Sequence, residues 1–72
     1  MEIIRTVTLR DQSKASVFWD DGWEGYGWET EAAGANGPFN SVEEAVEALM
    51  EECEGMLQER EARKLAELRS ED

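Results

Sequence analysis

The sequence predicts an α+β domain, with a three-stranded antiparallel sheet and one long C-terminal amphipathic helix packed on one face of the sheet. This prediction depends on alternating β-branched residues near the N-terminus, a turn signal between two aromatic segments, and apolar residues at helical spacing from residue 42 onward. We expect the sheet and helix to form a domain over residues 1–57, followed by a charged helical extension over residues 58–72.

The first strand is predicted over residues 2–10, where β-branched and polar side chains alternate. Strict alternation places Ile3, Val7 and Leu9 on one side of this strand, and the threonines on the other. The polar residues 11–14 then favour a turn.

The second and third strands are predicted over residues 15–20 and 23–32. Asp21-Gly22 lies between them and is a strong signal for a two-residue hairpin loop, in which Asp20 would pair with Trp23. One face of this hairpin is the better candidate core, because it contains Ala15, Val17, Trp19, Tyr26 and Trp28.

The opposite face of the predicted hairpin contains two large aromatic residues, Phe18 and Trp23. A single helix covers only one face of a sheet, so no element of the chain remains to bury them. We therefore expect both side chains to be exposed, unless the loop over residues 33–38 folds over them or a second copy of the chain covers them.

Residues 33–38 (AGANGP) are rich in Gly and Pro and are predicted to connect the sheet to the helix. A helix is then expected to begin at a capping box formed by Ser41 and Glu44. Helical spacing is followed by Val42, Ala45, Val46, Leu49, Met50, Cys53, Met56 and Leu57.

Gly55 is the only residue that interrupts the predicted helix, which we expect to bend or fray there and to continue over residues 56–70. Leu57, Leu65 and Leu68 form a thinner apolar stripe in this segment. The pattern leaves open whether the segment packs, dimerises or projects into solvent.

The composition argues against catalysis and against a cofactor. The chain has no histidine, and its serines have no evident base beside them. Cys53 lies within the apolar stripe, which predicts a buried and inert thiol. A chain of 72 residues is also too short to form the walls of a substrate cleft. We expect no enzyme activity, no catalytic residue and no cofactor.

A specific metal site is not expected either. The acidic residues between positions 20 and 31 do not alternate as an EF-hand loop requires. A single cysteine is typical of the reducing cytoplasm, and no apolar run approaches the roughly 20 residues that span a bilayer.

The charge is concentrated in one part of the chain. The formal net charge is −11, and residues 15–59 contain 12 acidic residues with no Lys or Arg. Direct binding to nucleic acid or to an anionic membrane is therefore disfavoured. On the predicted helix every outward sector is acidic, and Glu47 forms like-charge i,i+4 pairs with Glu43 and Glu51, each costing about 0.2–0.5 kcal/mol.

Two interpretations of this acidity stay open, namely solubility alone and a binding surface for a cationic partner. Favourable interaction with the helix dipole explains glutamates in the first turn but not those beyond it. For the binding interpretation, a carboxylate array resembles the charge density of a nucleic-acid backbone, so the expected partner is a basic nucleic-acid-binding protein. The expected contact residues are Asp20, Asp21, Glu24, Glu29, Glu31, Glu43, Glu44, Glu47, Glu51 and Glu54, with Trp23 and Phe18 as apolar anchors.

The chain is similar in four respects to small phage-encoded inhibitors, among them anti-CRISPR proteins, some of which act as DNA mimics. These are its size, its acidity, the predicted order of its elements and the segment FNSVEEA at residues 39–45. The resemblance implies a location in the host-cell cytoplasm. It also implies as target a subunit of a CRISPR interference complex that handles target DNA.

A similar helix start occurs in HicB-like antitoxins, so a second function class is retained. In this alternative the chain is a structural or antitoxin-like domain that forms a homodimer. Its contacts would come either from the face with Phe18 and Trp23 or from the stripe of Leu57, Leu65 and Leu68.

Overall fold

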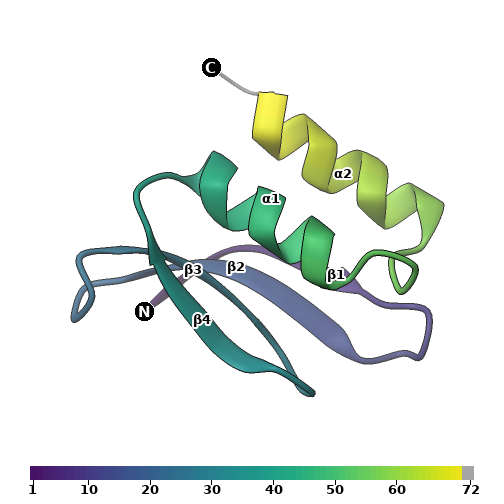
Figure 1. The fold of residues 1–72 in the computed structure, drawn as a ribbon, viewed down its shortest axis with the longest axis horizontal. Coiled ribbons are helices and arrows are strands. Elements are labelled where there is room, and N and C mark those ends of the chain that lie inside the picture. Colours follow the sequence, from purple (N-terminus) through teal and green to yellow (C-terminus); the bar gives the residue numbers. More distant parts are fainter. Residues whose placement is uncertain (71–72) are drawn as a thin grey trace.

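The computed structural model describes residues 1–70 and has an α+β architecture in which two helices lie on one side of an antiparallel sheet (Figure 1). The sheet has four strands in the order β1-β2-β3-β4. The elements are β1 (Glu2–Thr8), β2 (Lys14–Asp20), β3 (Gly25–Thr30), β4 (Gly34–Phe39), α1 (Val42–Glu52) and α2 (Glu59–Ser70). The predicted class is confirmed, whereas the predictions of three strands and of one long helix are wrong.

The additional strand, β4, is the segment that was predicted to be a connection. It pairs with β3 along the sheet edge, with Asn36 opposite Trp28 and Phe39 opposite Tyr26. Sequence patterns do not predict this strand, because it contains glycines and Pro38 and both residue types are depleted in strands. An edge position tolerates proline, since one side of the strand donates no ladder hydrogen bonds.

The loop between β2 and β3 spans four residues, 21–24, so the predicted pairing of Asp20 with Trp23 is wrong. Asp20 pairs with Gly25 instead. The Asp20 Oδ1 atom accepts hydrogen bonds from the backbone N–H groups of Gly22 (2.8 Å) and Trp23 (3.2 Å). These bonds favour the longer loop, which closes with Glu24 at a φ of 54°.

The predicted and the observed registers of β2 and β3 differ by two residues, which is the period at which side chains return to the same face of a strand. Each residue therefore keeps its predicted face. Val17 and Trp28 are paired on the helix side and are 0% and 3% exposed. Trp19 and Tyr26 share that face but are only half-buried, with ring centroids 5.0 Å apart.

β1 departs from strict alternation. Ile3 pairs with Phe18 and Arg5 with Val17, so an irregularity lies between these two pairs. The extra residue reverses the side-chain direction, which places Ile3 on the helix-free face and Val7 on the helix side. Ile3 is 46% exposed and Val7 2%, so the expectation that they share a side is wrong.

One hydrophobic core lies between the sheet and the helices. It combines residues from β1 to β3 with residues from both helices and from the segment between them. Its buried members are Val7, Leu9, Ala15, Val17, Trp28, Ala45, Val46, Leu49, Cys53, Leu57 and Leu65.

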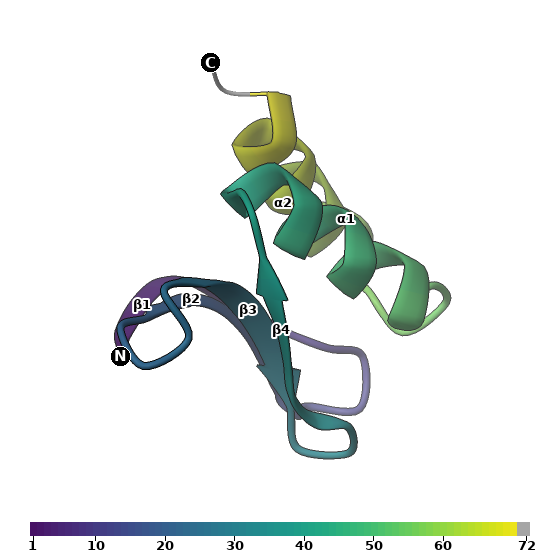
Figure 2. The same cartoon turned by 60° about the vertical axis from the view of Figure 1, so that its left-hand side comes forward.

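α1 ends at Glu52, and residues 53–56 form a turn before α2. Gly55 has a φ of +86°, a conformation that glycine adopts without the steric cost of a side chain. Leu57 then forms an isolated β-bridge with Leu9. The chain reverses over this turn, and α2 runs back beside α1 on the same side of the sheet (Figure 2).

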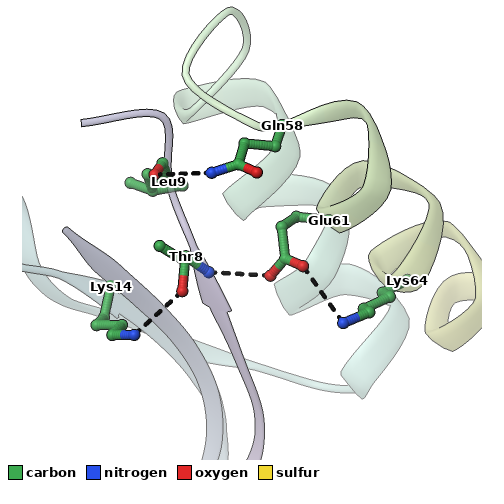
Figure 3. Close-up of polar contacts among 6 residues, drawn as sticks. All are labelled: Thr8, Leu9, Lys14, Gln58, Glu61 and Lys64. Atoms are coloured by element: carbon green, nitrogen blue, oxygen red, sulfur yellow. Dashed lines mark hydrogen bonds and ion pairs between the residues drawn. The ribbon is translucent and has the colours of Figure 1, made fainter. Parts of the chain in front are cut away.

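α2 is attached to the edge strand β1 by polar contacts (Figure 3). The backbone N–H of Thr8 donates a 2.9 Å hydrogen bond to Glu61 Oε2, and Lys64 Nζ lies 3.4 Å from Glu61 Oε1. Gln58 Nε2 donates to the Leu9 carbonyl at 3.3 Å. Leu65 is fully buried beside these contacts. Within residues 59–70, the segment whose role was left open therefore packs onto the domain.

The helix-free face has a small cluster of its own. Phe18 is 1% exposed, so the expectation that it is exposed is wrong, whereas Trp23 remains 39% exposed. Their ring centroids lie 5.8 Å apart. A Cβ atom added to Gly27 or Gly37 would lie 2.9 or 2.8 Å from Trp23 Cζ3. Trp23 thus packs onto these glycines and against Phe18.

We predict that Gly27→Ala lowers the free energy of unfolding by about 1–3 kcal/mol, measured by urea denaturation. The added Cβ would lie 2.6 Å from the Asn36 carbonyl oxygen and 2.8 Å from Phe18 Cζ, so the strands or the aromatic pair must shift. The control is Gly22→Ala, whose nearest contact is a side-chain oxygen at 3.1 Å. Equal urea midpoints for the two variants would contradict this account of the second face.

We predict that Glu61→Gln destabilises the protein by about 1 kcal/mol at neutral pH. The hydrogen bond from Thr8 lowers the pKa of Glu61 below its ordinary 4.5, with smaller lowering contributions from Lys64 and Arg5. The native state therefore gains stability from ionised Glu61 above the ordinary pKa, and loses it as the pH falls through the lowered pKa.

Urea denaturation between neutral pH and pH about 3 tests this pH dependence. The difference between wild type and Glu61→Gln should shrink as Glu61 becomes protonated, because a neutral acid and an amide have similar shapes. A difference that stays constant with pH would show that the charge of Glu61 does not hold α2.

Candidate partner-binding surface

The acidic residues that were expected to form the contact surface come from several elements of the structure. Glu43, Glu44, Glu47 and Glu51 lie on α1, and Glu54 lies in the turn after it. Asp20 ends β2, Asp21 and Glu24 lie in the loop between β2 and β3, and Glu31 follows the C-terminal end of β3. Glu29 pairs with Ser16 on the helix-free face. The hairpin acids therefore divide between the two ends of the sheet, whereas those of α1 follow one helix.

Two hairpin acids have structural partners. Asp20 caps the loop between β2 and β3, as described above. Asp21 Oδ1 accepts a 2.6 Å hydrogen bond from the Trp19 indole N–H. These contacts account for Asp20 and Asp21 without any binding partner. Glu24 and Glu31 are exposed turn residues.

Glu44 also has a structural role, because the predicted capping box forms in part, with its carboxylate bonded to Asn40 rather than to the N-cap residue Ser41. The Ser41 hydroxyl accepts a hydrogen bond from the Glu44 backbone N–H at 3.2 Å. The Glu44 carboxylate in turn accepts from the Asn40 backbone N–H at 2.9 Å. Glu44 therefore satisfies a free donor at the helix start, which explains it locally.

The remaining carboxylates of this region have no such explanation. We define the acidic helix surface as Glu43, Glu47, Glu51, Glu52 and Glu54, all of which are exposed. Among the side chains that the structure describes, the ion pairs are Glu59 with Arg63 and Glu61 with Lys64, both within α2. No ion pair in that set compensates the like-charge pairs of α1.

The expected apolar anchors do not adjoin the acidic helix surface. Phe18 and Trp23 belong to the cluster on the helix-free side, opposite the face that α1 covers. Phe18 is buried, and Trp23 packs onto the sheet while keeping 39% of its surface exposed. The acidic helix surface therefore lacks the anchors that the sequence predicted for it.

The structure places a small cavity beside the C-terminal end of α1, which the sequence did not reveal. Its volume is about 100 Å³, and its walls include Trp28, Thr30, Ala32, Cys53 and Met56. The Trp28 Nε1 atom is buried and has no hydrogen-bond partner among the described residues. The strand pattern predicts only that Trp28 lies in the core. Whether its indole N–H has a hydrogen-bond partner depends on tertiary contacts, which the pattern does not reveal.

The Cys53 thiol, which was expected to be buried, is 4% exposed. Burial raises the pKa of Cys53, and the negative charges of Glu52 and Asp11 raise it further. At neutral pH the sulfur is therefore held as the neutral thiol, which is a poor nucleophile.

Within residues 1–70, no three acidic or cysteine side chains are grouped so that they could hold a metal ion. Neither α1 nor α2 has the length and apolar character needed to cross a membrane. Comparison of the chain with known protein families, curated proteins and solved structures gave no significant match.

We predict that Glu47→Lys raises the free energy of unfolding by about 0.5–1 kcal/mol, measured by urea denaturation at low salt. The change turns the repulsive pairs with Glu43 and Glu51 into attractive ones at the same spacing. Glu47→Gln is the control and should give a smaller gain, since it removes repulsion without adding attraction. Unchanged or reduced stability in Glu47→Lys would show that the glutamates of α1 do not strain the free protein.

Proposed function

We propose that this protein is a small non-enzymatic inhibitor. Its acidic helix surface binds the basic nucleic-acid-binding site of another protein and keeps nucleic acid out of that site. The observation that carries the proposal is the set of exposed glutamates on α1 that lack ion-pair partners among the described side chains.

α1 is a rigid support for these carboxylates. Its opposite face contributes Ala45, Val46 and Leu49 to the core, each 0% exposed. Neighbouring glutamates one turn apart are consequently held about 5–6 Å from each other, without the entropy cost of ordering a flexible segment on binding. Solubility alone would not require the charges to be concentrated on one ordered helix.

The mechanism we propose is exclusion by charge. A protein that binds nucleic acid neutralises phosphates with lysine and arginine. The same cations can pair with an array of carboxylates, so the inhibitor and the nucleic acid compete for one site. Association is then fast and falls with added salt, because the long-range attraction is screened.

The resemblance to anti-CRISPR proteins supports a specific partner class. On this basis the target is a subunit of a CRISPR interference complex that handles target DNA, encountered in the cytoplasm of the phage-infected cell. The inhibitor itself binds neither nucleic acid nor a membrane, because its net charge of −11 repels both.

A structural or antitoxin-like domain that self-associates is the second candidate. Leu57, Leu65 and Phe18 are buried within the chain, which removes most of the apolar surface expected for it. Ile3 and Trp23, 46% and 39% exposed, are the observation that still favours it. Light scattering at micromolar concentration distinguishes the two candidates, since a strict monomer excludes the homodimer.

We predict that Glu47→Lys with Glu51→Lys abolishes capture of a basic DNA-binding partner and leaves the fold intact. The double change reverses the charge at the centre of the acidic helix surface. Capture by tagged protein is measured from a lysate at low and high salt, and circular dichroism verifies the fold.

The matched control is Glu2→Lys with Glu59→Lys, which alters the net charge equally but lies outside α1. Glu59 forms only an exposed ion pair with Arg63, so its loss costs little stability. The control variant should retain most of the capture. Undiminished capture by the Glu47 and Glu51 variant, or equal loss in both variants, would refute recognition by the acidic helix surface.

A further inference from the structure

α1 ends without the charges that usually stabilise a helix end. Its last turn contains Glu51 and Glu52 and no basic residue, although positive charge is what stabilises a helix C-terminus. The apolar spacing that starts at Val42 also continues past this end, as far as Leu57. The local sequence therefore favours a helix that does not stop at residue 52.

The turn over residues 53–56 depends on the backbone of Gly55, whose φ is +86°. A Cβ atom added there would have nothing within 4 Å, so the positive φ, and not packing, is what requires glycine. A continuous helix also accommodates Gly55, at the modest cost that glycine brings to any helix interior. The segment between α1 and α2 therefore has two accessible conformations, a turn and a helix.

The contacts of α2 do not depend on which chain supplies this helix. The Thr8 N–H donates to Glu61 Oε2 at 2.9 Å, and Leu65 is fully buried in the core (Figure 3). α2 also packs along α1. Only the short connection over residues 53–58 joins α2 to the remainder of its own chain. An α2 from a second copy would make the same contacts.

The arrangement of the two helices makes such an exchange geometrically simple. α1 and α2 lie side by side and run in opposite directions (Figure 2). When the connection becomes helical, α2 extends beyond the end of α1 and away from its own sheet. Two such chains related by a two-fold axis through their connections place each α2 beside the α1 of the other copy, with identical contacts in both halves.

Contacts of the turn oppose the exchange. Leu57 forms a β-bridge with Leu9, and the Arg10 N–H donates to the Met56 carbonyl at 2.9 Å. Arg10 Nη1 donates to the Gly55 carbonyl at 3.2 Å. A continuous helix loses these contacts, and association also costs translational and rotational freedom. The monomer therefore dominates at low protein concentration.

We propose that this protein has a second, domain-swapped state, in which residues 42–70 form one continuous helix and the α2 of each copy occupies the place of α2 on the other. The surface formed by β1 and α1 is thus a binding surface for a second copy of the chain. This inference is independent of the proposed function. Each α1 stays on its own sheet, so the dimer presents two acidic helix surfaces. The exchange leaves the helix-free face, with Ile3 and Trp23, unused.

The first test is Gly55→Ala, measured by size-exclusion chromatography with light scattering at micromolar concentration. Alanine disfavours the positive φ and favours the helix, so the dimerisation constant should rise about a thousandfold, with about thirtyfold from each of the two chains. Gly55→Asn should give a smaller rise, because asparagine tolerates a positive φ.

The matched control is Gly34→Ala at the start of β4. Gly34 also has a positive φ, +70°, and a Cβ atom there would likewise have nothing within 4 Å. The change therefore brings a similar backbone strain without affecting the connection between the helices, and this variant should stay monomeric. A monomeric Gly55→Ala protein, or equal dimerisation of both variants, would overturn the proposal.

The contact between Thr8 and Glu61 shows whether α2 is exchanged. ¹⁵N-labelled and unlabelled Gly55→Ala chains are unfolded, mixed and refolded together. An isotope-filtered nuclear Overhauser effect is then expected from the Thr8 amide proton of a labelled chain to the Glu61 side chain of an unlabelled chain. A dimer in which this contact stays within each chain would refute the exchange of α2.

The wild-type protein provides a measurement that needs no variant, and it decides the matter if Gly55→Ala does not fold. Refolding at millimolar concentration should give a dimer fraction with the same contact between chains, whereas refolding at micromolar concentration should give the monomer. A wholly monomeric product at millimolar concentration would overturn the proposal. Capture of a basic partner through the acidic helix surface is a separate measurement, so either proposal can fail without the other.

Discussion

The burial of the apolar side of α1 on the sheet is the interaction on which the other features depend. Ala45, Val46 and Leu49 meet Val17 and Trp28, and all of these side chains are almost fully buried. This contact determines which face of each strand is apolar, because a strand presents alternate residues to one side. It also determines which glutamates of α1 face solvent.

The same contact leaves the other face of the sheet without a covering layer. The chain compensates locally, since the loop between β2 and β3 brings Trp23 across Gly27 and Gly37 and against Phe18. The absence of side chains at the two glycines makes the space for the indole ring. Trp23, a single loop residue, thus covers Phe18 in the way that a second helix would cover this face in a larger domain.

α2 completes the layer on the helix side and supplies groups to the edge of the sheet. Leu65 enters the core, and Glu61 accepts the hydrogen bond of Thr8 at the edge strand. An edge strand with satisfied donors is less available for pairing with other chains. The balanced charges of α2 contrast with α1, where exposed glutamates face solvent without compensating cations among the described side chains. This contrast within one small domain is what favours a binding role for α1.

The candidate site was only partly predictable, and particular residues show why. Helical spacing identified the outward glutamates of α1, because position on a helix follows from sequence separation. Of the acids that accept hydrogen bonds within the chain, the sequence indicated the role of Glu44 at the helix start. It did not indicate the roles of Asp20 and Asp21, because these depend on where the loop between β2 and β3 closes. The cavity beside Trp28 gave no signal, because its walls come from three separate parts of the chain, residues 9–13, 28–33 and 52–56.

The sequence by itself determined the α+β class, the core faces of β2 and β3, the start of α1 and the acidity of its outer side. Each of these is a local pattern whose period or spacing carries the information. Only the tertiary structure decided that a Gly- and Pro-rich segment is an edge strand, that β1 changes face between Ile3 and Arg5, and that the chain reverses near Gly55. Those outcomes depend on contacts between distant residues, such as the bridge from Leu9 to Leu57, which no local pattern encodes.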